Sequence, residues 1–248
     1  MNLFWDAIQF IFTPVWTIIR TERENDIVTR IGEHLGFTLV SLIAATIIAV
    51  PIGYAIGHFN KGREIAVGLS GAARAIPSLG LLTILALAVG FGARPIAAVV
   101  VFLVLGVPSI LAGAYAGIEA IDKRTIDAAR AVGMTEWQIL TKVEIPLGLP
   151  LLIGGIRAGA LQIVATVVLA AYVNLGGLGF YIIQGIPLRR FDMILGSAIV
   201  IVVLALVLDG LFALVQHLVV PRGVTAGRPK ELRTSSSRRR AVVEAPTA

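Results

Sequence analysis

The chain has 248 residues, of which 57% are hydrophobic and 15% charged, and it carries a formal net charge of +6. This composition is too apolar for a soluble domain, and several blocks reach the roughly twenty apolar residues that a bilayer span needs. The chain contains no cysteine, which excludes disulfide and thiolate chemistry. The three histidines lie far apart, with no second ligand at helical spacing, so we expect no metal ion and no other cofactor.

The basic residues do not form one face for nucleic acid. They gather in a few connecting segments and in the C-terminal tail, as membrane topology requires. We therefore expect membrane lipid, and no nucleic acid, as the partner of these charges.

The first 34 residues are expected to form an N-terminal extracytoplasmic segment. Residues 1–19 are apolar and aromatic but include Asp6, Gln9 and Pro14. They have no basic region and no small-residue cleavage site, so a signal peptide is not expected. The pattern favours an interfacial helix, with a full extra span as the alternative.

Five apolar blocks follow and predict an all-α fold, a polytopic membrane helix bundle with five transmembrane helices, or six if residues 1–19 span. The transmembrane domain is predicted for residues 35–218, and the Arg-, Ser- and Pro-rich residues 219–248 for a disordered basic cytoplasmic tail. Three Gly-x-x-x-Gly pairs, beginning at Gly53, Gly113 and Gly155, indicate generic close packing. The spans are expected at about residues 35–57, 65–89, 96–117, 151–173 and 193–217.

Two segments interrupt this regular pattern. Pro77, followed by Ser78, should kink the second span because proline removes a backbone hydrogen bond. The glycine-rich run from Asn174 to Gly179 should break the chain after the fourth span. Each break is a candidate gate where a helix pivots or lines a water-filled path, and the alternative is an ordinary kink and an ordinary loop. The candidate residues are Pro77, Ser78, Gly176, Gly177 and Gly179.

Three charged residues, Arg74, Arg157 and Asp209, fall inside predicted spans. A charge near the middle of a span costs about 2.5–3.5 kcal/mol, so it needs a partner or water. At 1.5 Å rise per residue the three lie at similar depth, roughly 10–15 Å from the cytoplasmic ends of their spans. We therefore expect Asp209 to pair with Arg157 or with Arg74. The pair is a candidate gate, and the alternative is a static pair or snorkelling to the interface.

The longest connection, residues 118–150 between the third and fourth spans, is polar and too long for a simple turn. It is predicted to form two short helices. Asp122 caps the first, over residues 123–132, and Gly133 stops it. Thr135 caps the second with Gln138 in a capping box, and Pro146 is expected to end it.

Helices this short are marginal alone in water, so they should dock on a partner protein or fold back on their own bundle. The segment resembles the cytoplasmic signature of ABC importer permeases: Glu-Ala-Ala, three residues, Gly, nine residues, Ile, one residue, Leu-Pro. The spacing agrees throughout, with three conservative departures. The matching positions are Asp127, Ala128, Ala129, Gly133, Val143, Ile145 and Pro146.

This resemblance implies a methionine-permease-like ABC importer transmembrane domain whose residues 118–150 form a coupling segment docked in a groove of an ATPase subunit. It also implies an ATPase dimer, a second permease copy or a homologous permease, and an extracytoplasmic substrate-binding protein as partners. The chain has no Gly-x-x-x-x-Gly-Lys-Ser/Thr motif, so ATP hydrolysis is expected on the separate subunit.

The Ile76-Pro77-Ser78-Leu79 run and the Gly154-Gly-Ile-Arg157 run resemble the osmoprotectant branch, whose permeases import glycine betaine, carnitine or choline. Three alternatives remain: an ABC importer permease for another solute such as methionine, a secondary transporter without an ATPase, and a non-transporting scaffold.

The basic residues also predict the orientation in the plasma (inner) membrane. Thirteen of the 21 lie on the side of residues 118–150 and six on the other side. Since basic loops stay in the cytoplasm, the coupling segment and the C-terminus should be cytoplasmic and the N-terminus outside.

Overall fold

The computed structural model describes residues 3–17 and 27–219. Every regular element within these ranges is a helix, which confirms the predicted all-α class. The predicted basic tail, except Val219, and residues 18–26 of the predicted N-terminal segment lie outside the described residues.

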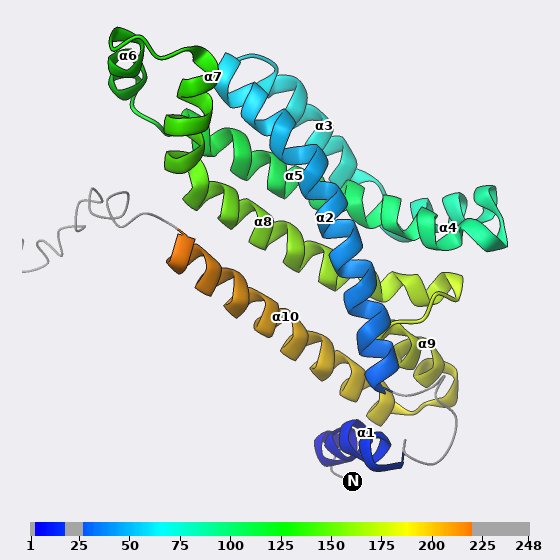
Figure 1. Ribbon diagram of the computed structural model, residues 1–248. Coiled ribbons are helices and arrows are strands. Elements are labelled where there is room, and N and C mark those ends of the chain that lie inside the picture. The colour runs from blue at the N-terminus through cyan, green and yellow to red at the C-terminus, as the bar shows by residue number, and fades with distance from the viewer. Residues whose placement is uncertain (1–2, 18–26, 220–248) are drawn as a thin grey trace, which may run out of the picture.

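Four described helical segments are long and apolar enough to cross a membrane (Figure 1). They contain the first, third, fourth and fifth predicted spans. The first helix starts eight residues before the predicted span, because Arg30 and Glu33 pair one turn apart at 2.9 Å and extend the helix into a polar region. The segments are α2 (Ile27–Phe59), α5 (Arg94–Glu119), α8 (Ile145–Val167) with the 3₁₀ helix η4 (Val168–Val173), and α10 (Phe191–Val219).

The second predicted span is broken rather than kinked. It consists of α3 (Arg63–Ala75) and α4 (Ser78–Val89), whose axes differ by 83°. Ile76 is extended, with φ −70° and ψ 129°, because the ring of Pro77 disfavours the helical conformation in the residue before it. The expected kink therefore became a complete break, and the pair forms either a broken span or a re-entrant loop.

The centre of the bundle is α5, which packs between α2 and α8 (Figure 1). Small residues let the backbones approach closely. A Cβ atom on Gly57 would lie 2.6 Å from the Cβ of Ile118, one on Gly113 would lie 2.7 Å from the Cα of Gly155, and one on Gly117 would lie 2.7 Å from the carbonyl oxygen of Gly148. The Gly-x-x-x-Gly pairs thus form the α2–α5 and α5–α8 contacts.

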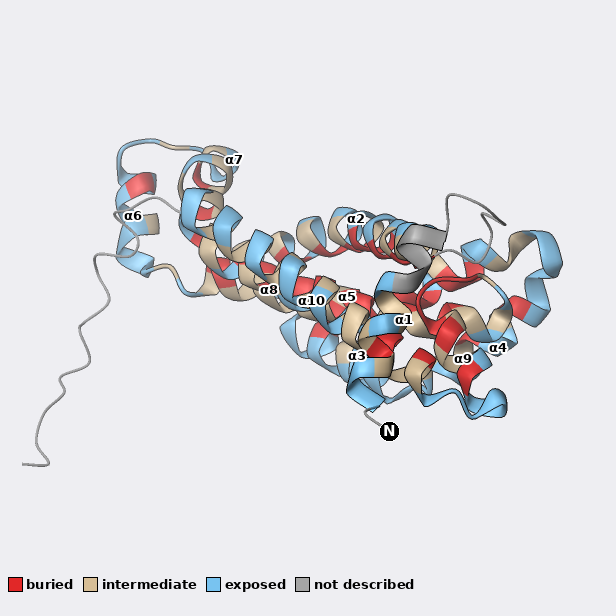
Figure 2. Ribbon diagram, turned by 90° about the horizontal axis from the view of Figure 1, so that it is seen from below, coloured by how far each residue is buried: buried red, intermediate tan, exposed pale blue. Residues whose placement is uncertain are grey.

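Many of the most deeply buried side chains lie where these three helices meet. Val101, Phe102 and Ile110 of α5 and Ile163 and Val167 of α8 are fully buried. By contrast, much of α4 and α10 is exposed (Figure 2), including Leu87 at 74% and Leu206 at 65%. Apolar side chains that face outward on membrane-spanning helices contact lipid, so this exposure fits a bundle surrounded by hydrocarbon.

Two shorter helices pack beside one end of α10 (Figure 1). α1 (Leu3–Thr17) has 15 described residues. Phe10 of α1 meets Tyr181 edge to face, with ring centroids 5.2 Å apart. α9 (Gly179–Leu188) follows the glycine-rich run.

The glycine contacts give a matched pair of substitutions in α8. A Cβ on Gly155 would lie 2.8 Å from the backbone of α5, whereas one on its neighbour Gly154 would meet nothing within 4 Å. We expect Gly155→Ala to destabilise the protein by about 1–3 kcal/mol, the usual cost of overpacking, and Gly154→Ala to change stability by less than about 1 kcal/mol. Thermal unfolding in detergent measures both, and equal stabilities would contradict the packing described here.

Candidate functional site

The first helix of the coupling segment is α6 (Lys123–Ala131). The Asp122 side chain accepts a 2.9 Å hydrogen bond from the backbone N–H of Arg124, as predicted for its cap. The helix ends at Gly133, whose φ is +84°, and the N–H of Gly133 bonds to the carbonyl of Arg130 at 2.9 Å. A glycine suits this left-handed C-terminal position because it has no Cβ. The predicted first helix and its two ends are confirmed.

The second helix, α7 (Glu136–Ile139), begins with the predicted capping box. The N–H of Gln138 bonds to the Thr135 hydroxyl at 3.3 Å, and the N–H of Thr135 bonds to the Gln138 side-chain oxygen at 2.9 Å. Both donors at the start of the helix are therefore satisfied.

The expectation that Pro146 ends this helix is wrong. A π-helical turn, η3 (Leu140–Glu144), follows α7, and Pro146 lies in the first turn of α8. In this wider turn the N–H of Ile145 bonds to the carbonyl of Leu140, five residues back. In an α-helix the proline ring would clash with the carbonyl four residues back, and the wide turn removes that clash. α7 therefore leads into the fourth span without a break.

The signature residues divide into two groups. Asp127, Ala128 and Gly133 are exposed, whereas Ala129 is buried. Val143, Ile145 and Pro146 are half-buried where the helix enters the bundle. Two large apolar side chains near the exposed group also face solvent: Val132 is 79% exposed and Trp137 is 72% exposed.

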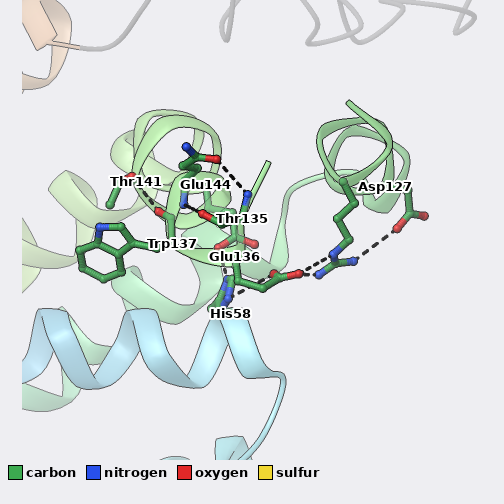
Figure 3. Close-up of polar contacts among 9 residues, drawn as sticks. His58, Asp127, Thr135, Glu136, Trp137, Thr141 and Glu144 are labelled. Carbon is green, nitrogen blue, oxygen red and sulfur yellow. Dashed lines mark hydrogen bonds and ion pairs between the residues drawn. The ribbon is translucent and has the colours of Figure 1, made fainter. Parts of the chain in front are cut away.

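An arginine joins the two helices of the segment (Figure 3). The guanidinium of Arg130 donates to both carboxylate oxygens of Glu136, at 2.9 and 3.2 Å, and lies 3.4 Å from Asp127. The hydrogen bond from Arg130 lowers the pKa of Glu136, and the same bond raises the pKa of Arg130. Both side chains are exposed, so salt weakens this contact.

Sequence reasoning missed a buried contact between α2 and the coupling segment. His58 Nδ1 lies 2.6 Å from Glu144 Oε2, and His58 Nε2 lies 3.5 Å from Glu136 Oε2. The side chains of His58 and Glu144 are only 7% and 6% exposed. The two residues are 86 positions apart, and the one sequence signal is that each lies next to an end of an apolar block.

The glycine-rich break packs on the first turns of α2. The N–H of Gly177 donates to Glu33 Oε2 at 2.7 Å, and the Arg30 guanidinium lies 4.0 Å from the centroid of the Phe180 ring. Gly176 and Gly177 have φ values of +78° and +73°. A Cβ on Gly176 would overlap the Glu33 carboxylate, and one on Gly179 would overlap the carbonyl oxygen of Val168.

The other predicted break, at Pro77 and Ser78, lies directly before α4. This helix packs against η4, the element that precedes the glycine-rich run. Pro77 is exposed and Ser78 is half-buried.

Of the two predicted charge pairs, the structure forms the one with Arg157. Its guanidinium makes two parallel contacts with the Asp209 carboxylate, both at 2.5 Å, which join α8 to α10. This fork geometry is the strongest arrangement available to an arginine and a carboxylate. Arg74 lies elsewhere, 3.2 Å from the Ser109 hydroxyl.

A polytopic helical bundle that carries this signature on a helical segment between two spans defines the permease subunit of an ABC importer. The chain belongs to the family described as "Binding-protein-dependent transport system inner membrane component", which it matches over residues 43–223. Membership implies an ATPase partner and a permease partner, and with the long apolar helices it makes the chain a multi-pass inner-membrane protein.

Curated relatives cover most of the chain. It is 32% identical to the glycine betaine/carnitine/choline transport system permease protein OpuCB of Bacillus subtilis (strain 168), over 81% of this chain and 91% of the relative. It is 30% identical to the carnitine transport permease protein OpuCB of Listeria monocytogenes, over 84% and 94%. The choline transport system permease protein OpuBB of Bacillus subtilis (strain 168) is 31% identical, over 81% and 90%.

Solved structures confirm the predicted methionine-permease-like fold. Two inward-facing crystal forms of the MetNI methionine ABC transporter contain a chain that superposes on this one with TM-scores of 0.66 and 0.69. The alignments cover 79% and 78% of this chain and 96% of the solved chains, at 23% identity. Similarity at this level shows the fold and does not identify the solute.

The Arg130–Glu136 contact predicts a pH dependence. Because Arg130 lowers the Glu136 pKa below its ordinary value of 4.5, the contact stabilises the segment above that value and is lost as the pH falls through the lowered pKa. We expect α6 amides to exchange hydrogen faster in Glu136→Gln than in the unmodified protein at about pH 6, and equally fast at about pH 3. Glu64→Gln, on exposed α3, is the control. A difference that persists at low pH would show that the carboxylate does not carry the effect.

Proposed function

We propose that this chain is the permease subunit of an ATP-driven importer and forms the translocation path for an osmoprotectant such as glycine betaine, carnitine or choline. A separate pair of ATPase subunits would hydrolyse ATP, and an extracytoplasmic substrate-binding protein would deliver the solute. The exposed signature residues at α6, together with the exposed surface of α7, carry the ATPase part of the proposal. The names of relatives about 30% identical over four-fifths of the chain support the solute class.

The surface of α6 and α7 suits a protein partner. Ala128 and Gly133 are small and exposed, so a partner backbone can approach closely, and a Cβ on Gly133 would meet nothing within 4 Å. Val132 and Trp137 beside them supply apolar contact area. Aromatic side chains of this kind commonly anchor protein interfaces.

The connections on either side of this surface suit the transmission of movement. α6 follows the end of α5 after three residues, and α7 continues through the π turn into α8. Displacement of the coupling segment by a closing ATPase dimer would therefore tilt the two helices that cross at Gly113 and Gly155. ATP favours one orientation of the path only through its higher affinity for the closed ATPase dimer.

The orientation proposed from the basic residues places α6 and α7 in the cytoplasm and α1 at the outer surface. Residues 1–34 would then form the outer segment, residues 35–218 the transmembrane domain, and residues 219–248 a cytoplasmic tail. A second copy of the chain, or a homologous permease, would complete the path. The exposed apolar faces of α3 and α4 leave room for such a neighbour as well as for lipid.

Within the membrane, the Arg157–Asp209 pair and the two helix breaks are the proposed moving parts. The pair joins α10 to α8, and the breaks free the backbone where α3 meets α4 and where η4 meets α9. This pairing also disfavours a secondary transporter, because Asp209, the carboxylate that would have to bind a coupling ion, is already held by an arginine.

Isolation of the tagged chain from its own membranes tests the proposed function. We expect an ATPase subunit to co-purify, and Gly133→Arg to reduce its recovery at least tenfold because the arginine side chain fills the docking surface. Gly133→Asn is the control, since asparagine tolerates a positive φ and adds less bulk.

In liposomes that contain the complex and its binding protein, glycine betaine, carnitine or choline should enter in an ATP-dependent manner. Methionine uptake without uptake of these amines would overturn the proposed solute class. Uptake by the chain without any ATPase would establish a secondary transporter.

Exchange of the two intramembrane charges tests the pair. Arg157→Asp and Asp209→Arg alone should each reduce uptake at least tenfold, because each leaves two like charges facing one another within the membrane. The double exchange should recover at least a third of the original uptake. The exchange of Arg74 with Asp209 is the control and should recover none. Failure of the Arg157–Asp209 exchange to improve on either single change would show that the pair has no specific role.

A further inference from the structure

We propose that His58 is a positioning residue for coupling, which ties α2 to the coupling segment so that movement of the segment reaches α2 as well as α5 and α8. This inference rests on the proposed function, because it concerns how the same segment acts on the bundle. The covalent chain connects the coupling segment only to α5 and α8.

The contact itself is specific and buried. An ionised carboxylate only accepts hydrogen bonds, so Nδ1–H of His58 donates to Glu144 across 2.6 Å. The imidazole lies in the last turn of α2. Glu144 lies in the π turn η3, and π turns recur at functional positions. A carboxylate that is 6% exposed requires such a partner, because an unpaired buried charge is costly.

The contact continues to the signature itself (Figure 3). His58 Nε2 lies 3.5 Å from Glu136, Glu136 accepts two hydrogen bonds from Arg130, and Arg130 contacts Asp127. These residues come from α2, α7 and α6. The orientation of α6 relative to α2 is therefore held by a chain of polar contacts that ends at the first residue of the signature.

At its other end, α2 contacts the glycine-rich break. Glu33 accepts the N–H of Gly177 at 2.7 Å, and α2 is one continuous helix from Glu33 to His58, a length of about 38 Å at 1.5 Å per residue. α2 therefore contacts the coupling segment with one end and the break beyond η4 with the other. Its close approach to α5 at Gly57 and Ile118 keeps the two helices together, so a displacement at His58 is carried along α2.

Two spin labels test the tie without any partner protein. The chain contains no cysteine, so Lys61→Cys and Thr125→Cys, both at exposed positions, label the end of α2 and the start of α6 alone. In nanodiscs, the distance distribution between the labels should be narrow in the otherwise unmodified chain and at least twice as wide in His58→Ala. His217 is an exposed histidine in the last turn of α10, and His217→Ala should leave the distance distribution narrow. An unchanged width in His58→Ala overturns the inference.

Transport measurements distinguish a positioning role from a general loss of structure. In the reconstituted complex, His58→Ala should lower the solute imported per ATP hydrolysed at least fivefold while the ATPase still co-purifies. His58→Asn should retain at least half, because its amide nitrogen replaces the Nδ1 donor. Glu136→Gln, which leaves the buried pair intact, should lower the ratio about twofold.

An unchanged ratio in His58→Ala, or an equal loss in His58→Asn, overturns the inference. Absence of solute uptake by the unmodified complex would instead overturn the proposed function, while the label distances would still decide whether His58 ties α2 to α6.

Discussion

The close approach of the α5 backbone to α2 and α8 is the constraint on which the rest of the structure depends. In lipid, no hydrophobic driving force holds apolar helices together, so their association relies on packing and on polar contacts. Gly113 and Gly155 bring α5 and α8 into backbone contact, and Gly57 does the same between α2 and α5. The three helices form one unit, and α10 adds to it through the Arg157–Asp209 pair. The position of the coupling segment follows, because α5 leads into it and α8 leads out of it.

The polar interactions join elements that this packing does not hold together. His58 and Glu144 lie at one end of the bundle, Glu33 and the glycine run lie at the other end of α2, and Arg157 with Asp209 joins the outermost helix. Each contact connects two elements of the bundle through a charged side chain. Packed glycine crossings resist separation because any gap forfeits dispersion contacts, whereas a charged contact can exchange partners or admit water. A bundle built in this way can tilt as a unit and rearrange at these polar contacts.

The sequence predicted those features that depend on local chemistry. The Asp122 cap, the Thr135–Gln138 capping box and the Gly133 stop all follow from residues within one or two turns of each other, and the structure has each of them. Pro146 was misinterpreted because the π turn before it relieves the clash that normally ends a helix. The break at Pro77 was underestimated because the angle after a proline depends on what the following helix packs against, here η4 and α5. The contact between His58 and Glu144 joins residues 86 positions apart, and no local pattern predicts it.

The exposed apolar residues of this chain have two physical explanations, and their surroundings separate them. Leu87 and Leu206 lie on helices with few charges, so lipid accounts for their exposure. Val132 and Trp137 lie on a segment that also carries Asp127, Arg130 and Glu136, and hydrocarbon would leave those charges without water at a cost of several kcal/mol each. A segment that presents ion pairs and a 72% exposed tryptophan on the same surface therefore suits a protein partner with both polar and apolar groups better than it suits lipid.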